Sequence, residues 1–265
     1  MLSIFNLAPV FKAPLLKPFS FWASKWLGID KLNDHLAQLQ KKHPDDERAL
    51  IEEMPSMYKH DIRFVEEQLA NIPKTGPCII VANHPTDLLD QLTITNVLSK
   101  VRRDYKFTAN SQVEKFGLWN NIVFMLCLNG ESDTAKQNFK SIRGAIDWLN
   151  AGHVLITYPS ARPSSLSKKA RNGRKKWSSL PVMLSQKAGA PIVSMRITLK
   201  EPLHHRLLKR FIRVAYGLLA LRVLSYFSGK PITLTVGEAF YPPKEKLDKR
   251  QAGEILENSV SKLAR

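Results

Sequence analysis

The stretch that decides the fold of this chain is residues 79–91, Ile79-Ile80-Val81-Ala82-Asn83-His84-Pro85-Thr86-Asp87-Leu88-Leu89-Asp90-Gln91. An apolar run that follows a turn signal at residues 74–77 predicts a short buried β-strand. Pro85 cannot donate a backbone hydrogen bond to a sheet and suits a first helical turn, so we expect the strand to end at His84 and a helix to begin just after it. The stretch therefore predicts an imidazole at the carboxyl end of a buried strand.

Two carboxylates follow this imidazole in the sequence, Asp87 and Asp90. Both would lie on one face of the expected helix, and either could reach back to the ring of His84. A histidine whose Nδ1–H is held by a carboxylate keeps Nε2 as a general base. The alternative is a pair of acids that suit the helix dipole, beside a hydrogen-bonded loop histidine.

The pair Asn83-His84, followed by an aspartate after an apolar strand, resembles the glycerol-phosphate and lysophospholipid acyltransferase superfamily. Most members of that superfamily have four residues between the histidine and the aspartate. This chain has Leu89 at that place and Asp90 one position later. The longer spacing, together with Asn-His-Pro, is similar to the branch called hemolysin-like acyltransferases, which includes lyso-ornithine-lipid acyltransferases. The resemblance implies that His84 is the base, that Asp90 orients it, and that Asp87 belongs to the helix terminus.

A second motif lies at residues 154–164, where another apolar strand runs into a loop. The superfamily usually reads Phe-Pro-Glu-Gly-Thr-Arg-Ser here. Tyr158 matches, whereas Ser160 stands where glutamate is usual, and the basic residue comes one position earlier, as Arg162. Arg162 could hold a carboxylate or phosphate with its planar guanidinium, or it could be a solvated loop arginine.

Two weaker motifs complete the resemblance, which covers residues 73–198. Residues 188–194 contain Gly-Ala-Pro before a strand, as in the last block of the superfamily, and Asn110 fits the second block of the branch. The arginine that usually follows the glycine of that block is absent after Gly130. The residues that we predict to lie near the substrate are Asn83, Asp87, Asn110, Tyr158, Ser160 and Arg162.

The composition allows one large domain, because the 265 residues are 44% hydrophobic. Cys78 and Cys127 lie in apolar runs and offer neither a disulfide framework nor a metal-ligand spacing, so we expect a reducing compartment. The net charge of +17 is concentrated, because residues 148–237 hold sixteen Lys and Arg and one acidic residue, Glu201. This part of the chain is predicted to meet anions.

Three segments favour contact with a membrane surface. Residues 2–27 are rich in Leu, Phe and Trp but are interrupted by prolines, which favours an interfacial anchor over an arm packed on the protein's own core. Residues 203–226 have the pattern of a basic amphipathic helix. The basic run at 168–176 lacks the interleaved aromatics on which nucleic-acid bases stack, so we favour an anionic lipid or an acidic carrier protein as its partner over nucleic acid or plain solvent. We predict a peripheral protein on the cytoplasmic face of a membrane.

Strands that alternate with helices predict an α/β sheet covered on both faces. The resemblance implies, more narrowly, a mixed central sheet flanked by helices, as in glycerol-3-phosphate acyltransferases, with a helical, membrane-facing N-terminal segment. Residues 30–71 are predicted to form two or three helices, and the apolar stretch 116–129 is compatible with helix or strand. We expect an N-terminal arm with helices at 1–72, the α/β domain at 73–243 and a C-terminal helix at 244–265. The expected strands are 78–82, 106–109, 154–158, 192–198 and 232–237, and the expected helices are 87–99, 135–150, 178–188, 203–226 and 244–263.

The resemblance and the charge pattern together predict a membrane-associated O-acyltransferase. It would move a fatty acyl group from an acyl thioester, acyl-CoA or acyl carrier protein, to the hydroxyl of a lysolipid-type acceptor, with no metal and no further cofactor. The alternative is a peripheral lipid-binding protein on the same scaffold that has lost catalysis, because Ser160 and the missing arginine of the second block depart from the superfamily pattern.

Overall fold

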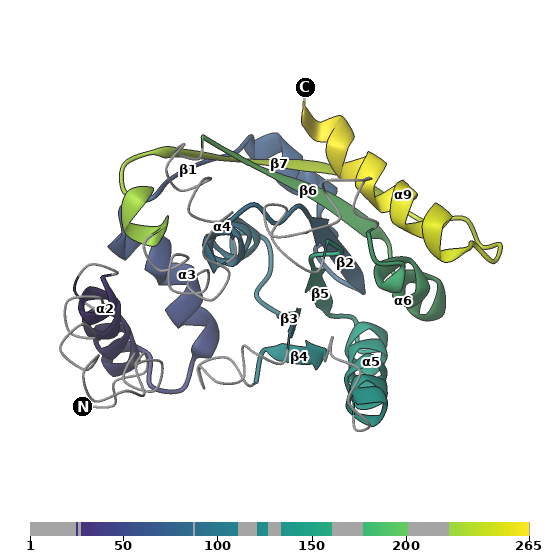
Figure 1. Cartoon of the computed structure of the whole chain (residues 1–265), viewed down its shortest axis with the longest axis horizontal. Coiled ribbons are helices and arrows are strands. Elements are labelled where there is room, and N and C mark those ends of the chain that lie inside the picture. Colours follow the sequence, from purple (N-terminus) through teal and green to yellow (C-terminus); the bar gives the residue numbers. More distant parts are fainter. Residues whose placement is uncertain are drawn as a thin grey trace, which may run out of the picture.

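The computed structural model describes residues 25, 28–86, 88–110, 121–126, 134–160, 177–200 and 223–264. Its centre is a seven-stranded sheet in the order β1-β7-β6-β2-β5-β3-β4 (Figure 1). The strands are β1 (Asp61–Arg63), β2 (Cys78–Ala82), β3 (Tyr105–Asn110), β4 (Val123–Leu126), β5 (Val154–Thr157), β6 (Ile192–Leu199) and β7 (Pro231–Phe240).

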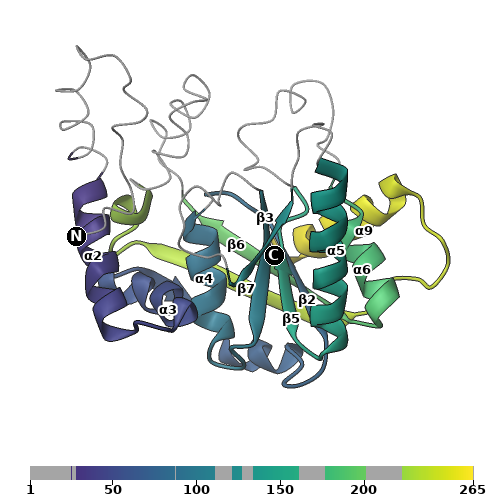
Figure 2. The same cartoon turned by 90° about the horizontal axis from the view of Figure 1, so that it is seen from below.

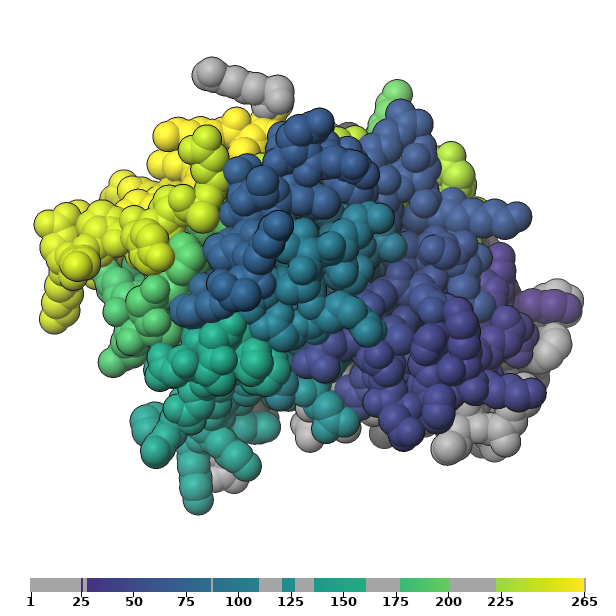
Figure 3. Space-filling view, turned by 180° about the vertical axis from the view of Figure 1, so that it is seen from behind, coloured from purple at the N-terminus to yellow at the C-terminus, as the bar shows by residue number. Residues whose placement is uncertain are grey.

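All neighbouring strands pair in parallel except β6 and β7, which are antiparallel. The strands β6, β2, β5, β3 and β4 therefore point the same way. We call the edge of the sheet where they end the carboxyl edge, and the opposite edge the amino edge. Figure 3 views the molecule from the side of the amino edge, where the segments coloured blue to teal lie together at the centre of the surface.

Helices cover both faces of the sheet (Figures 1 and 2). One face carries α2 (Ile29–Lys42), α3 (Glu47–Met57) and α4 (Leu88–Leu98), and the other carries α5 (Thr134–Asn150), α6 (Leu180–Ala188) and α9 (Lys249–Ser261). Two 3-10 helices, η2 (Glu66–Asn71) and η6 (Lys262–Ala264), lie beside β7.

The strand β2 is buried on both faces because it lies between these two layers. Ile80 and Ala82 pack into the hydrophobic cluster of α2, α3 and α4, whereas Ile79 and Val81 pack into the cluster of α5, α6 and α9. A parallel strand that is covered on both sides is continuously apolar rather than alternating, which is the pattern of residues 78–82.

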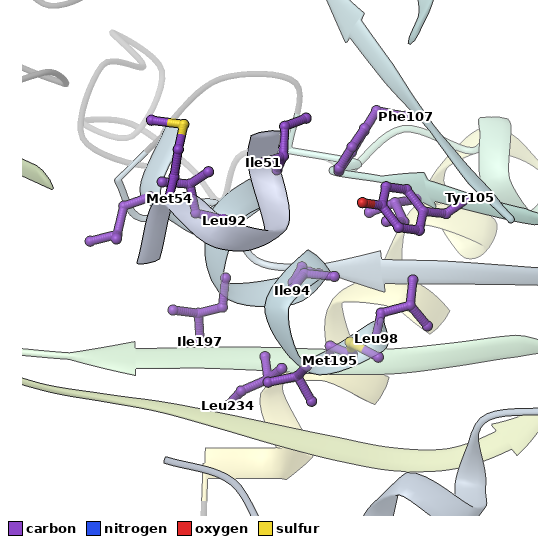
Figure 4. Close-up of a cluster of buried hydrophobic side chains, with 14 of the residues drawn as sticks. Ile51, Met54, Leu92, Ile94, Leu98, Tyr105, Phe107, Met195, Ile197 and Leu234 are labelled. Carbon is purple, nitrogen blue, oxygen red and sulfur yellow. The ribbon is translucent and has the colours of Figure 1, made fainter. Parts of the chain in front are cut away.

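The larger cluster joins the helical N-terminal part of the chain to the sheet (Figure 4). Ile51 and Met54 of α3 are 1% exposed and lie against α4, and Ile51 also lies toward Phe107 of β3 (Figure 4). Burying an aliphatic side chain of this size contributes about 1.5–3 kcal/mol. The labelled members of the cluster are Ile51, Met54, Leu92, Ile94, Leu98, Tyr105, Phe107, Met195, Ile197 and Leu234.

The mixed α/β sheet predicted from the sequence is confirmed, and the five expected strands correspond to β2, β3, β5, β6 and β7. The apolar stretch 116–129 contains a strand, β4. Residues 30–71 do form helices, but β1 interrupts them, because Asp61–Arg63 pairs with residues 231–233 of β7 far along the chain. Four expected helices correspond to α4, α5, α6 and α9, although α9 begins only at Lys249.

The expected strand 78–82 and helix 87–99 agree with β2 and α4 to within one residue, but the expectation that the strand ends at His84 and that Pro85 opens the helix is wrong. The strand ends at Ala82 and the helix begins at Leu88, so Pro85 lies in a bend and not in the first helical turn. The physical reason is that side chains take over hydrogen bonding in this connection. Asn83 continues the pairing with β6, and Asp90 accepts from the backbone of Thr86.

Of the predicted membrane-facing segments, residues 2–24, 26–27, 168–176 and 203–222 lie outside the described residues, and residues 223–226 are helical. Across the parts of the chain that the structure describes, no helix has both the length and the apolar content needed to cross a bilayer. The proposed boundaries at 72 and 243 stay a prediction.

Candidate active site

The predicted imidazole lies at the carboxyl edge, between two strands whose connections diverge. His84 follows β2 and Tyr158 follows β5, and these strands are neighbours in the sheet. The helix after β2, α4, packs on one face of the sheet, whereas the next described helix after β5, α6, packs on the other. In open α/β sheets such a divergence leaves a crevice at the strand ends, where ligands bind.

The ring of His84 is held by a buried carboxylate. Its Nδ1 lies 2.9 Å from Oδ2 of Asp90, and the two side chains are 10% and 0% exposed. When Nδ1 donates its proton to this carboxylate, the lone pair of the neutral ring is on Nε2. The geometry therefore selects the tautomer that a general base needs.

Thr86 holds the same carboxylate through both of its oxygens. Its backbone N–H donates to Oδ2 of Asp90 at 2.8 Å, and its hydroxyl donates to Oδ1 at 2.5 Å. The sequence pattern did not single out Thr86. The only signal was a hydroxyl residue four positions before an acid at a helix start, a pattern that is common in ordinary helix caps.

Tyr158 covers a face of the imidazole. The two rings stack with their centroids 4.4 Å apart and an angle of 22° between their planes. Tyr158 is 8% exposed and Ser160 is 6% exposed, so the strand end after β5 is buried here. Tyr158 and Ser160 of the second sequence motif thus lie at the same edge as His84, and Tyr158 is in direct contact with it.

Asn83 binds the backbone of the neighbouring strand. Its Nδ2 donates to the carbonyl of Ile197 at 2.8 Å, and its Oδ1 accepts from the N–H of the same residue at 2.7 Å. Since the regular pairing of β2 with β6 ends at Ala82 and Met195, the amide continues the ladder for one more step. These bonds fix the backbone directly before His84, and a contact of Asn83 with substrate stays a prediction.

The structure brings only some of the predicted site residues together. The backbone of Asn110 ends β3 at the carboxyl edge, where it is paired with Leu126. Asp87 and Arg162 lie outside the described residues. Within the described ranges, no group of three or more His, Cys, Asp or Glu side chains could hold a metal ion.

The fold and the site define a class of protein, an α/β protein with a carboxylate-held histidine at the strand ends, an arrangement suited to proton transfer. The family model named Acyltransferase matches residues 63–198, just over half of the chain, and this range contains His84, Asp90 and Tyr158. The chain therefore belongs to the acyltransferase family.

One solved structure that is similar to this chain is the crystal structure of the 1-acyl-sn-glycerophosphate (LPA) acyltransferase PlsC from Thermotoga maritima. The sequences are 18% identical, the match covers 83% of this chain and 82% of that chain, and the TM-score is 0.49. A comparison with curated proteins found no match.

Proposed function

We propose that this acyltransferase moves an acyl group from a thioester to the hydroxyl of a lysolipid-type acceptor, with His84 as the general base. The observation that carries the proposal is the contact between Nδ1 of His84 and Oδ2 of Asp90, at 2.9 Å, at the carboxyl edge of the sheet. Five residues separate the two, and this spacing supports a place in the hemolysin-like branch.

The proposed reaction uses the histidine twice. Nε2 of His84 takes the proton of the acceptor hydroxyl while the oxygen attacks the thioester carbonyl, and the tetrahedral intermediate then expels the thiolate. The imidazolium returns its proton to that sulfur, so the products are an ester and a free thiol. Asp90 stabilises the imidazolium, as the carboxylate of a Ser-His-Asp triad does, except that the substrate supplies the hydroxyl.

The distribution of charge supports an anionic acceptor at a membrane surface. Residues 161–176 hold seven Lys and Arg, and residues 201–222 hold five, with Glu201 as the only acid. These segments follow β5 and β6, whose carboxyl ends lie on either side of the end of β2, close to which His84 lies. Arg162 is the proposed contact with the anionic group of the acceptor, because its guanidinium can bind phosphate or carboxylate with two hydrogen bonds.

The test is a transfer assay with the full-length protein, a labelled acyl thioester and a panel of lysolipids with phosphate, zwitterionic and ornithine headgroups. Donors are acyl-CoA and acyl carrier protein in separate arms. We expect one ester product for each thiol released, detected by mass spectrometry, with at least one donor. Failure of every pair to react, with binding to anionic vesicles retained, would instead support a lipid-binding protein without catalysis.

A further inference from the structure

The geometry points to Thr86 as a positioning residue that holds Asp90, and through it the tautomer of His84, an inference that rests on the proposed function. Thr86 does not touch the imidazole in any contact described above. It acts on the carboxylate, which receives the backbone N–H of Thr86 on Oδ2 and its hydroxyl on Oδ1. Both oxygens of Asp90 are thereby engaged by one residue.

Burial makes these contacts necessary. Asp90 is 0% exposed and Thr86 is 1% exposed. A charged carboxylate that is removed from water must receive hydrogen bonds from the protein, otherwise it takes up a proton and loses its charge. The hydroxyl of Thr86 supplies one of these hydrogen bonds to Asp90, the carboxylate that accepts the Nδ1 proton of His84.

The two bonds also fix the direction of the carboxylate. Asp90 stands in the first turn of α4, which begins only at Leu88. Its carboxylate reaches back four residues to Thr86, before the start of the helix. With Oδ1 held by the hydroxyl, Oδ2 is the oxygen left to face His84 at 2.9 Å. Without the hydroxyl, the carboxylate can rotate about its last torsion, which is soft for aspartate.

The substitution that isolates this effect is Thr86→Val. Valine keeps the β-branched shape and the backbone N–H and removes only the hydroxyl. Thr86→Ser restores a hydroxyl on a smaller side chain. The matched control is Thr93→Val, because Thr93 is also buried, at 0% exposure, and belongs to the same helix, but its hydroxyl donates to the carbonyl of Leu89 at 2.8 Å.

The first measurement is kinetic. We expect Thr86→Val to lower kcat by about 10- to 100-fold, a part of the ~10²–10⁴ that a positioned general base contributes, with KM unchanged within about twofold. Thr86→Ser and Thr93→Val should keep kcat near that of the wild type. In the Asp90→Asn background, Thr86→Val should cause no further loss. An equal loss in both backgrounds, or a wild-type kcat for Thr86→Val, would overturn the inference.

The second measurement does not depend on turnover. In protein with ¹⁵N-labelled histidine, at a pH where the ring is neutral, the signals of His84, assigned by their loss in His84→Ala, should show one tautomer with the proton on Nδ1. Thr86→Val should give shifts averaged between the two tautomers, and Thr93→Val should not. A single Nδ1–H tautomer in Thr86→Val overturns the positioning role. If the wild type transfers no acyl group, the proposed function fails, but these spectra still decide the role of Thr86.

Discussion

Two histidine–aspartate pairs lie at opposite edges of the same sheet. At the carboxyl edge, Nδ1 of His84 lies 2.9 Å from Oδ2 of Asp90. At the amino edge, Nδ1 of His153 lies 3.0 Å from Oδ2 of Asp104. The two contacts are nearly identical in length and in the atoms they join, so the contact alone does not distinguish a catalytic pair from a structural one.

The amino-edge pair belongs to a network built around a guanidinium. Arg102 donates to both oxygens of Asp104 and to the carbonyls of Pro73, Gly76 and Gly152, which lie in the turns before β2 and β5. Burial raises the pKa of Asp104, but the hydrogen bonds from Arg102 and His153 outweigh burial and lower that pKa below its usual value. Here Arg102 already neutralises the charge of the carboxylate, and its hydrogen bonds connect the turns before β2 and β5.

The carboxyl-edge pair differs in what else holds the carboxylate. Thr86 supplies neutral donors to Asp90, and neutral donors satisfy the carboxylate oxygens without cancelling their charge. That charge can stabilise an imidazolium when His84 takes a proton. Under the proposed function, Asp90 stabilises the general base, whereas Asp104, which a guanidinium holds, serves the fold.

The largest expected effect comes from removing each imidazole in turn. His84→Ala should lower kcat by about 10⁴-fold or more, to a residual rate measured at high enzyme concentration, because the proposed base is lost. His153→Ala should keep kcat within about threefold, because Arg102 still holds Asp104. Thiol release with the same donor and acceptor measures both variants. Equal losses of kcat for His84→Ala and His153→Ala would show that the two histidine–aspartate pairs do not differ in function.

The next effect concerns the carboxylate of the proposed catalytic pair. Asp90→Asn should lower kcat by about 10³–10⁴-fold, since it removes the charge that stabilises imidazolium and can select the wrong tautomer. The corresponding change at the other edge, Asp104→Asn, should leave kcat near that of the wild type. Steady-state kinetics on both proteins, with folding checked by circular dichroism, makes the comparison.

Asp104→Asn should instead reduce the free energy of unfolding at neutral pH, by about 1–3 kcal/mol, because a hydrogen-bonded partner of a buried guanidinium is weakened. The pH dependence has a defined sign. Because the pKa of Asp104 is lowered in the folded state, its contribution is present above the unfolded pKa, about 4, and is lost as the pH falls below it. Urea unfolding from neutral to acidic pH should show the wild type and the variant converging. A constant difference at all these pH values would contradict this account.

The smallest expected effect is at the stacked ring. Tyr158→Leu removes the aromatic contact with His84, a contact worth about 0.5–1.5 kcal/mol, so kcat should fall by about 2- to 10-fold. Tyr158→Phe keeps the ring and should stay closer to the wild type. If Tyr158→Phe has the larger effect in the same kinetic assay, the hydroxyl rather than the stacking is what matters.

Much of the fold could be predicted from the sequence, because β2 and β5 lie in the interior of the sheet and each leaves an apolar run. The edge strand β1 could not be predicted, because Asp61–Arg63 is only three residues long and two of the three are charged. These residues form a strand only through pairing with β7. The bend at Pro85 between β2 and α4 could not be predicted either. It depends on hydrogen bonds that Asn83 and Asp90 make across the connection.

The histidine and the carboxylate of the site could be predicted from the sequence, but the residues that hold them in place could not. A histidine after a strand and an acid six residues later predicted which groups could meet. The preference for Asp90 over Asp87 came from the family resemblance and not from the pattern itself. Thr86 binds Asp90 and Asn83 binds the backbone of Ile197 through hydrogen bonds. In the sequence, these residues look the same as an ordinary helix cap or strand end.

The measurement that tests the central claim most directly is the double-mutant cycle on His84 and Asp90. It requires kcat/KM for the wild type, His84→Ala, Asp90→Asn and the double variant, with one donor and one acceptor. Because the carboxylate acts only through the imidazole, the double variant should be no slower than His84→Ala alone. Losses that add, so that Asp90→Asn slows an enzyme already lacking His84 by as much as it slows the wild type, would contradict the account of the two as one catalytic unit.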